Sequence, residues 1–128
     1  MNITAEVGTT LPFERFWRWL KEHSNCILEA GTTTASIFDF EDLHWGFVQE
    51  EDGRVIAQLV RGKSLVGEVV IDPSEVTYVQ ATPDAEGINR GQWIFEAMAS
   101  AGEQEFVAAY FVLAHGLEEL GKHEVLKH

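Results

Sequence analysis

The segment FERFWRWLKEHSNC, residues 13 to 26, contains the first side chains of this sequence that could carry chemistry. An imidazole within reach of a thiol favours the thiolate, so His23 and Cys26 suggest a nucleophile or a pair of metal ligands. Zinc needs a second pair, and no other His or Cys lies at ligand spacing before the C-terminus. Cys26 also opens a predicted strand in line with Leu28 and Ala30, where free cysteine packs as a small apolar side chain. We therefore expect packing at Cys26 rather than catalysis.

A second group of possible ligands lies near the C-terminus and consists of His115, Glu118, Glu119 and His123. Two imidazoles and a carboxylate at helical spacing can bind iron or zinc. These positions fall on the last turns of a predicted helix and beyond Gly121, where charged side chains are normally hydrated. We expect no metal and no cofactor.

The stretch DFEDLHWGFVQEED, residues 39 to 52, holds six carboxylates and no basic residue. General acid and base catalysis needs a carboxyl whose pKa is raised by burial, whereas these acids lie at predicted turns. A contact surface fits better, because Trp45 and Phe47 share one strand face and are flanked by acids, as aromatic anchors with a charged rim are. The alternative is that both rings point inward and fill the core.

The composition limits the classes of partner. Nine Lys and Arg against 21 Asp and Glu give a formal charge of −12, a field that repels nucleic acid and anionic lipid and attracts a basic protein.

One cysteine fits a reducing compartment, residues 1 to 10 lack the pattern of a signal peptide, and the apolar run 106 to 114 is shorter than the ~20 residues that span a bilayer. We expect a soluble cytoplasmic protein. Nucleotide-binding, hydrolase and zinc-protease motifs are absent from the sequence, so a binding protein is favoured over an enzyme.

The opening segment predicts an amphipathic helix over residues 11 to 23, capped by Thr10. Its apolar stripe at i, i+3, i+4 and i+7 consists of Phe13, Phe16, Trp17 and Leu20. Trp19 lies off this stripe beside His23, and its ring is expected to meet another subunit, cover a pocket edge or stack on the imidazole. Alternating apolar residues also allow a short strand over residues 3 to 7.

Residues 25 to 81 predict an antiparallel sheet, because short runs rich in Val, Ile, Phe and Tyr alternate with turn residues. The Asp52-Gly53 pair is the strongest hairpin signal. Short connections predict that each of six strands pairs with the next: CILEA, ASIFDF, HWGFVQ, RVIAQLV, SLVGEVVI and EVTYVQA. RVIAQLV and SLVGEVVI carry aliphatic side chains on both faces, which indicates either a half-barrel curled around a helix or a second subunit on the outer face.

The C-terminal third predicts a loop over residues 82 to 91 and helices over 89 to 101 and 103 to 121, separated by Gly102. The second helix is apolar nearly all round. The whole chain, residues 1 to 128, is thus predicted to be a single α+β domain: a curled antiparallel β-meander of about six strands packed against an N-terminal helix and a long C-terminal helical segment.

This order of elements is similar to the helix-grip arrangement of the START and Bet v 1-like ligand-binding proteins, in which a curled sheet grips a long helix over an apolar cavity. The strands here are shorter than those that enclose such a cavity. In size and charge the chain also resembles small acidic secretion chaperones, which carry a mid-sheet helix that this chain lacks. Neither resemblance assigns a role to a residue.

Two functions follow as expectations. The first is a non-enzymatic, homodimeric binding protein, such as an adaptor, chaperone or immunity protein, that binds a basic or amphipathic protein through Asp39, Glu41, Asp42, Trp45, Phe47 and Trp19. The alternative is a protein that binds a small apolar ligand between the sheet and the C-terminal helix, in a pocket lined by Trp17, Phe38, Phe106 and Tyr110.

Overall fold

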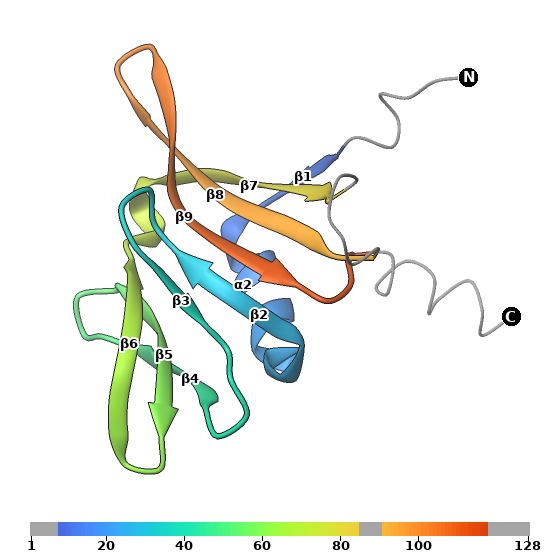
Figure 1. Ribbon diagram of the computed structural model, residues 1–128. Helices are drawn as coiled ribbons and strands as arrows, with labels where there is room; N and C mark the ends of the chain where they lie inside the picture. Colours follow the sequence, from blue (N-terminus) through green and yellow to red (C-terminus); the bar gives the residue numbers. More distant parts are fainter. Residues whose placement is uncertain (1–7, 85–90, 118–128) are drawn as a thin grey trace, which may run out of the picture.

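A computed structural model describes residues 8 to 84 and 91 to 117 of the chain. These residues form one α-helix, two short 3₁₀ turns (Ser24–Cys26 and Pro73–Glu75) and nine strands (Figure 1). In chain order the elements are β1 (Thr9–Leu11), α2 (Phe13–Glu22), β2 (Ile27–Gly31), β3 (Ser36–Phe38), β4 (His44–Gln49), β5 (Val55–Arg61), β6 (Ser64–Ile71), β7 (Val76–Pro83), β8 (Trp93–Ala101) and β9 (Gln104–Leu113).

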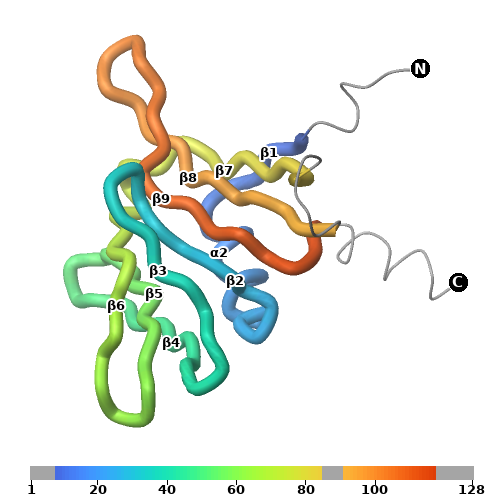
Figure 2. The backbone as a smooth tube through the Cα atoms, viewed as in Figure 1, coloured from blue at the N-terminus to red at the C-terminus, as the bar shows by residue number. Residues whose placement is uncertain are grey.

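The strands form two antiparallel sheets rather than one meander. The larger sheet has the order β1-β7-β8-β9-β2-β3, and the smaller has the order β4-β5-β6. The chain leaves the larger sheet after β3 and returns to it at β7, a path that Figure 2 shows as a tube. The predicted sequential sheet is therefore wrong at two junctions, since β3 does not pair with β4 and β6 does not pair with β7.

The helix α2 packs between the two sheets. Its Phe16 ring lies 5.2 Å from Phe95 of β8 and 5.7 Å from Phe111 of β9, measured between ring centroids. One position along, the ring of Trp17 meets Phe47 of β4 edge-on at 5.4 Å. The apolar stripe predicted from sequence is thus the surface through which the helix contacts both sheets.

The helix begins two residues later than predicted. Thr10, the predicted cap, lies in β1 and pairs with Gln80 of β7, so its backbone is extended. Pro12 occupies the N-cap position without a side-chain hydrogen bond, and its carbonyl accepts from the Phe16 amide at 3.1 Å. Strand pairing therefore takes precedence over the local capping signal.

The long C-terminal helical segment is wrong, and with it the predicted fold class. Residues 93 to 101 and 104 to 113 are the strands β8 and β9, joined by a two-residue turn in which Gly102 has φ of 67°. Buried side chains occur at every second position of these strands, such as Phe95 and Ala97 in β8 and Ala109 and Phe111 in β9. The side chains between them are partly exposed. A continuous apolar run is compatible with a buried strand as well as with a helix, and Gly102 forms the turn instead of breaking a helix.

Other predictions fall partly or wholly outside the described ranges. The predicted strand over residues 3 to 7 lies outside them, as do the end of the predicted helix beyond 117 and most of the predicted loop over 82 to 91. Among the described residues no helix is long and apolar enough to cross a membrane.

Truncating Phe16 tests the central packing. Phe16 is fully buried among Phe95, Phe111 and Trp19, so Phe16→Ala is expected to lower the free energy of unfolding by about 3–5 kcal/mol. Phe106→Ala is the matched control: this ring is 47% exposed, and its removal is expected to cost less than about 1 kcal/mol. Urea unfolding monitored by far-UV circular dichroism measures both values. Equal losses in the two variants would contradict the packing described here.

Candidate functional site

The segment from Phe38 to Asp42 carries the most exposed aromatic side chains among the described residues. Phe38 is 60% exposed and Phe40 is 67% exposed, and they alternate with acids. The backbone is held in place on both sides: the Asp39 amide donates to the Leu28 carbonyl at 3.0 Å, and the Asp39 carboxylate accepts from the Phe40 amide at 2.9 Å. The two rings are therefore presented to solvent by a hydrogen-bonded loop.

The strand β6 touches the end of β3 at one point. An added Cβ at Gly67 of β6 would lie 2.7 Å from Ile37 Cγ2, next to Phe38. Figures 1 and 2 show that the two strands pass each other there and that the chain after β3 then turns away toward β4. Leu65 and Val66, 53% and 50% exposed, lie farther along β6. We call the surface formed by Phe38 and Phe40, at the end of β3 where it meets β6, the β3–β6 seam.

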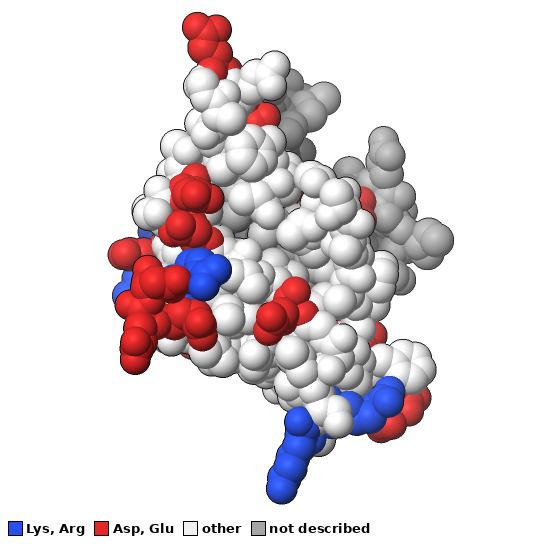
Figure 3. Space-filling model, turned by 90° about the vertical axis from the view of Figure 1, so that its left-hand side faces the viewer, with Lys and Arg blue, Asp and Glu red and all other residues white. Residues whose placement is uncertain are grey.

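Charge surrounds the seam unevenly. Glu41 and Asp42 are exposed next to Phe40, and Asp39 is half-buried between the two rings. Figure 3 views the molecule from the side on which β6 lies in Figure 1, and it shows a broad uncharged area with acidic groups beside it and Lys and Arg at its lower end. The acids Glu41 and Asp42 border Phe40, whereas the exposed Arg61 and Lys63 lie at the turn that precedes β6.

The structure separates the predicted partner residues. Asp39, Glu41 and Asp42 share the loop after β3, but Trp45 and Phe47 lie half-buried on the inner face of β4. The Trp45 indole N–H donates to the Ile27 carbonyl at 3.2 Å, and Phe47 packs on Trp17. Both rings point toward the core, which is the alternative stated for them in the sequence analysis.

The three other acids of the predicted stretch lie at the opposite end of β4. Glu50, Glu51 and Asp52 occupy the β4–β5 turn. The backbone N–H of Arg54 donates to Asp52 and lowers the pKa of that carboxyl, and the Arg54 side chain adds an ion pair at 2.8 Å. Sequence reasoning treated all six acids as one surface, whereas β4 divides them into two groups.

The predicted apolar pocket does not form among the described residues. Trp17 is buried in α2, Phe38 belongs to the seam, and Phe106 lies near the tip of the β8–β9 hairpin. Tyr110 points to the outer face of the larger sheet, because its neighbour Phe111 points inward. Since residues 104 to 113 form a strand, the helix that would have closed the pocket is missing.

Tyr110 instead joins three strands through its hydroxyl. It donates to the Glu29 carboxylate of β2 and lies within hydrogen-bond distance of the Ser36 hydroxyl of β3. Burial, together with the bond to Glu29, raises the pKa of Tyr110. A tyrosine with a raised pKa stays protonated at neutral pH. The Tyr110 hydroxyl therefore links the strands as a hydrogen-bonding group and is not a general base.

Trp19 is buried in the core and stacks on an imidazole, one of the three outcomes expected from sequence. Its ring centroid lies 4.6 Å from that of His23, which also bonds to the Trp19 carbonyl through Nδ1 at 2.8 Å. His115 lies 5.2 Å from His23 and 5.8 Å from Trp19, again between ring centroids. Glu118, Glu119 and His123 lie outside the described residues. Within those residues no three His, Cys, Asp or Glu side chains are grouped as metal ligands.

Comparisons with protein-family models, with curated proteins and with solved structures found no match for this chain. Phe40 was missed in the sequence analysis. A signal for it was available, since it is the last residue of the predicted strand ASIFDF and is enclosed by acids on both sides.

The Tyr110 cluster predicts a pH-dependent contribution to stability. Its raised pKa means that the folded state favours the protonated phenol, so the contribution is complete below the unfolded pKa, about 10, and is lost as the pH rises through the folded pKa. Tyr110→Phe is therefore expected to lower the free energy of unfolding by about 1 kcal/mol at pH 7, and the difference from the unmodified protein should shrink as the pH rises through the raised pKa of Tyr110.

Tyr78→Phe is the matched control, because Tyr78 also donates to a carboxylate, Glu105 at 3.0 Å, but in an exposed setting. Chemical unfolding at a series of pH values measures both variants. A loss in Tyr110→Phe no larger than that in Tyr78→Phe would contradict the role assigned to the cluster.

Proposed function

We propose that this chain is a non-enzymatic binding protein that holds a basic, amphipathic protein segment at the β3–β6 seam. The observation that carries the proposal is the exposure of Phe38 and Phe40, more than half of each ring, between acidic neighbours. Exposed apolar patches rimmed by polar residues mark interaction sites, and large aromatic side chains dominate the binding energy of interfaces. Of the two functions expected from the sequence we keep this one, because the apolar pocket that the other function needs does not form among the described residues.

The charge of the seam selects the chemistry of the partner. Glu41 and Asp42 border the rings, and the whole chain carries a formal charge of −12. Acidic margins speed the encounter with a basic segment and disfavour an acidic one. The partner therefore combines an apolar face, which covers Phe38 and Phe40, with Lys or Arg beside it.

The backbone favours a helical partner over an added strand. β3 is only three residues long, and its outer edge faces β6 instead of open solvent (Figure 1). Strand addition needs a free edge of hydrogen-bonding groups, whereas an amphipathic helix needs only an apolar surface on which to lie. An amphipathic helix fits the seam better for this reason.

The predicted homodimer would use another face. Two copies meeting at the seam would bring the acids of both loops together, which is unfavourable. A separate apolar row crosses the outer face of the smaller sheet, where Val48, Ile56 and Val70 lie in register. We place a homodimer contact, if the chain forms one, on this row.

A synthetic amphipathic helix of leucine and lysine tests the proposal, with a leucine and glutamate peptide of the same pattern as the probe of charge. Isothermal titration calorimetry is expected to show binding of the lysine peptide only. The double variant Phe38→Ser/Phe40→Ser should weaken that binding at least about tenfold, because it removes both anchors. Glu41→Gln/Asp42→Asn should weaken it less and reduce its dependence on salt.

Val48→Ser/Val70→Ser is the matched control, since it removes two exposed apolar side chains from the row on the smaller sheet. Circular dichroism confirms that each variant is folded. Equal weakening by the two apolar double variants, or equal binding of the glutamate peptide, would overturn the proposal.

A further inference from the structure

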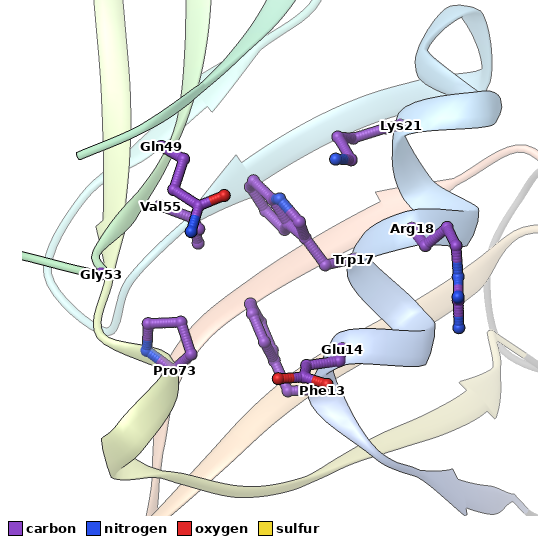
Figure 4. A pocket seen from close by; sticks show the side chains of 9 residues that line it. All are labelled: Phe13, Glu14, Trp17, Arg18, Lys21, Gln49, Gly53, Val55 and Pro73. Carbon is purple, nitrogen blue, oxygen red and sulfur yellow. The ribbon is translucent and has the colours of Figure 1, made fainter. Parts of the chain in front are cut away.

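A cleft separates α2 from the end of the smaller sheet. It has a volume of about 380 Å³, within the range of roughly 300–1,000 Å³ typical of small-molecule sites. The helix contributes Phe13, Glu14, Trp17, Arg18 and Lys21, and the sheet side contributes Gln49, Gly53, Val55 and Pro73 (Figure 4). None of these residues belongs to the β3–β6 seam.

The floor of the cleft is apolar and fixed in place. Phe13 and Trp17 lie one helical turn apart with their rings stacked, 5.6 Å between centroids and 21° between planes. Phe47 supports Trp17 edge-on from below, and Val55 is buried on the opposite wall. Phe13 and Trp17 are only 6% and 8% exposed, so a ligand in the cleft contacts the small exposed parts of these rings.

Two charged groups of the helix face the cleft, one at each end. Figure 4 shows the Lys21 amine at one end and the Glu14 carboxylate beside Phe13 at the other, with the Arg18 guanidinium turned away. Among the described residues Lys21 forms no ion pair with a carboxylate. Figure 4 shows the Lys21 amine turned toward the cleft and the Gln49 amide facing Trp17 from β4.

The acids of the β4–β5 turn limit the charge of the ligand. Glu50 and Glu51 follow Gln49 in sequence and are exposed, but they do not line the cleft. Their field opposes a ligand with several negative charges, such as a nucleotide, more strongly than a ligand with one. A single anionic group placed at the helix side lies beside Lys21 and away from the turn.

We propose that this cleft binds a small amphipathic monoanion, a carboxylate with an aromatic or branched apolar body. The apolar body lies over the exposed parts of Trp17 and Phe13 and against Val55 and Pro73, the carboxylate lies at the Lys21 amine, and the Gln49 amide donates a further hydrogen bond. This site is independent of the proposed protein partner, since it uses a different surface and a ligand of the opposite charge.

Two dyes that share an aromatic body test the site in the full-length protein. 1-Anilinonaphthalene-8-sulfonate is a monoanion, and N-phenyl-1-naphthylamine is its uncharged counterpart. Fluorescence titration is expected to give one anionic-dye site per chain. Lys21→Gln should weaken the anionic dye about three- to tenfold and change the neutral dye less than about twofold, since only the former loses a charge-assisted contact.

Arg15→Gln is the matched control, because Arg15 lies on the same helix but outside the cleft, and it should leave both dyes unchanged. Gln49→Trp places a large ring at the exposed rim and should block both dyes. Unchanged binding in Lys21→Gln or in Gln49→Trp, with circular dichroism showing both variants folded, overturns the cleft proposal. Loss of dye binding in Phe38→Ser/Phe40→Ser also overturns it, because the dye would then occupy the seam, and this result leaves the proposed protein contact intact.

Discussion

The packing of Phe16 between Phe95 and Phe111 is the interaction on which the rest of this structure depends. The two sheets share no strand pairing, so their relative position is set by what lies between them. That element is α2, whose Phe16 contacts the larger sheet while Trp17 contacts Phe47 of the smaller one. The cleft follows from the position of this helix, and direct contacts between the sheets, the Trp45 bond to Ile27 and the approach of Gly67 to Ile37, add to it.

The parts of the fold that sequence predicts are those with a strong local signal. The stripe of α2 and the six strands between residues 25 and 81 follow from periodicity and turn residues, and the hairpin predicted at Asp52-Gly53 joins β4 to β5. The similar turn at Gly102 was mistaken for a break between helices, because the apolar run after it satisfies helical spacing as well as alternation. The pairing of β2 with β9 joins distant parts of the chain, and no local pattern specifies such a partner.

The candidate surface could be predicted only in part, because contacts with distant parts of the chain decide which side chains are exposed. Alternation places Trp45 and Phe47 on one face of β4 without saying which face meets the core, and a shift by one residue exchanges the two faces. Contact with Trp17 and the bond from Trp45 to Ile27 decide the matter, and both depend on where α2 and β2 lie. Phe38 and Phe40 are exposed because they lie at and beyond the end of an edge strand, where no helix covers them.

A net charge describes the average of a surface and not the field at a site. Six of the 21 acids lie in the loops at the two ends of β4, whereas the exposed side of α2 carries three basic residues, Arg15, Arg18 and Lys21, and two acids, Glu14 and Glu22. Local fields of opposite sign therefore exist on one small protein, since exposed charges farther apart than ~8–10 Å are largely screened at physiological salt. An acidic protein can for this reason present acids beside Phe40 to a basic segment and the single amine of Lys21 to a small anion.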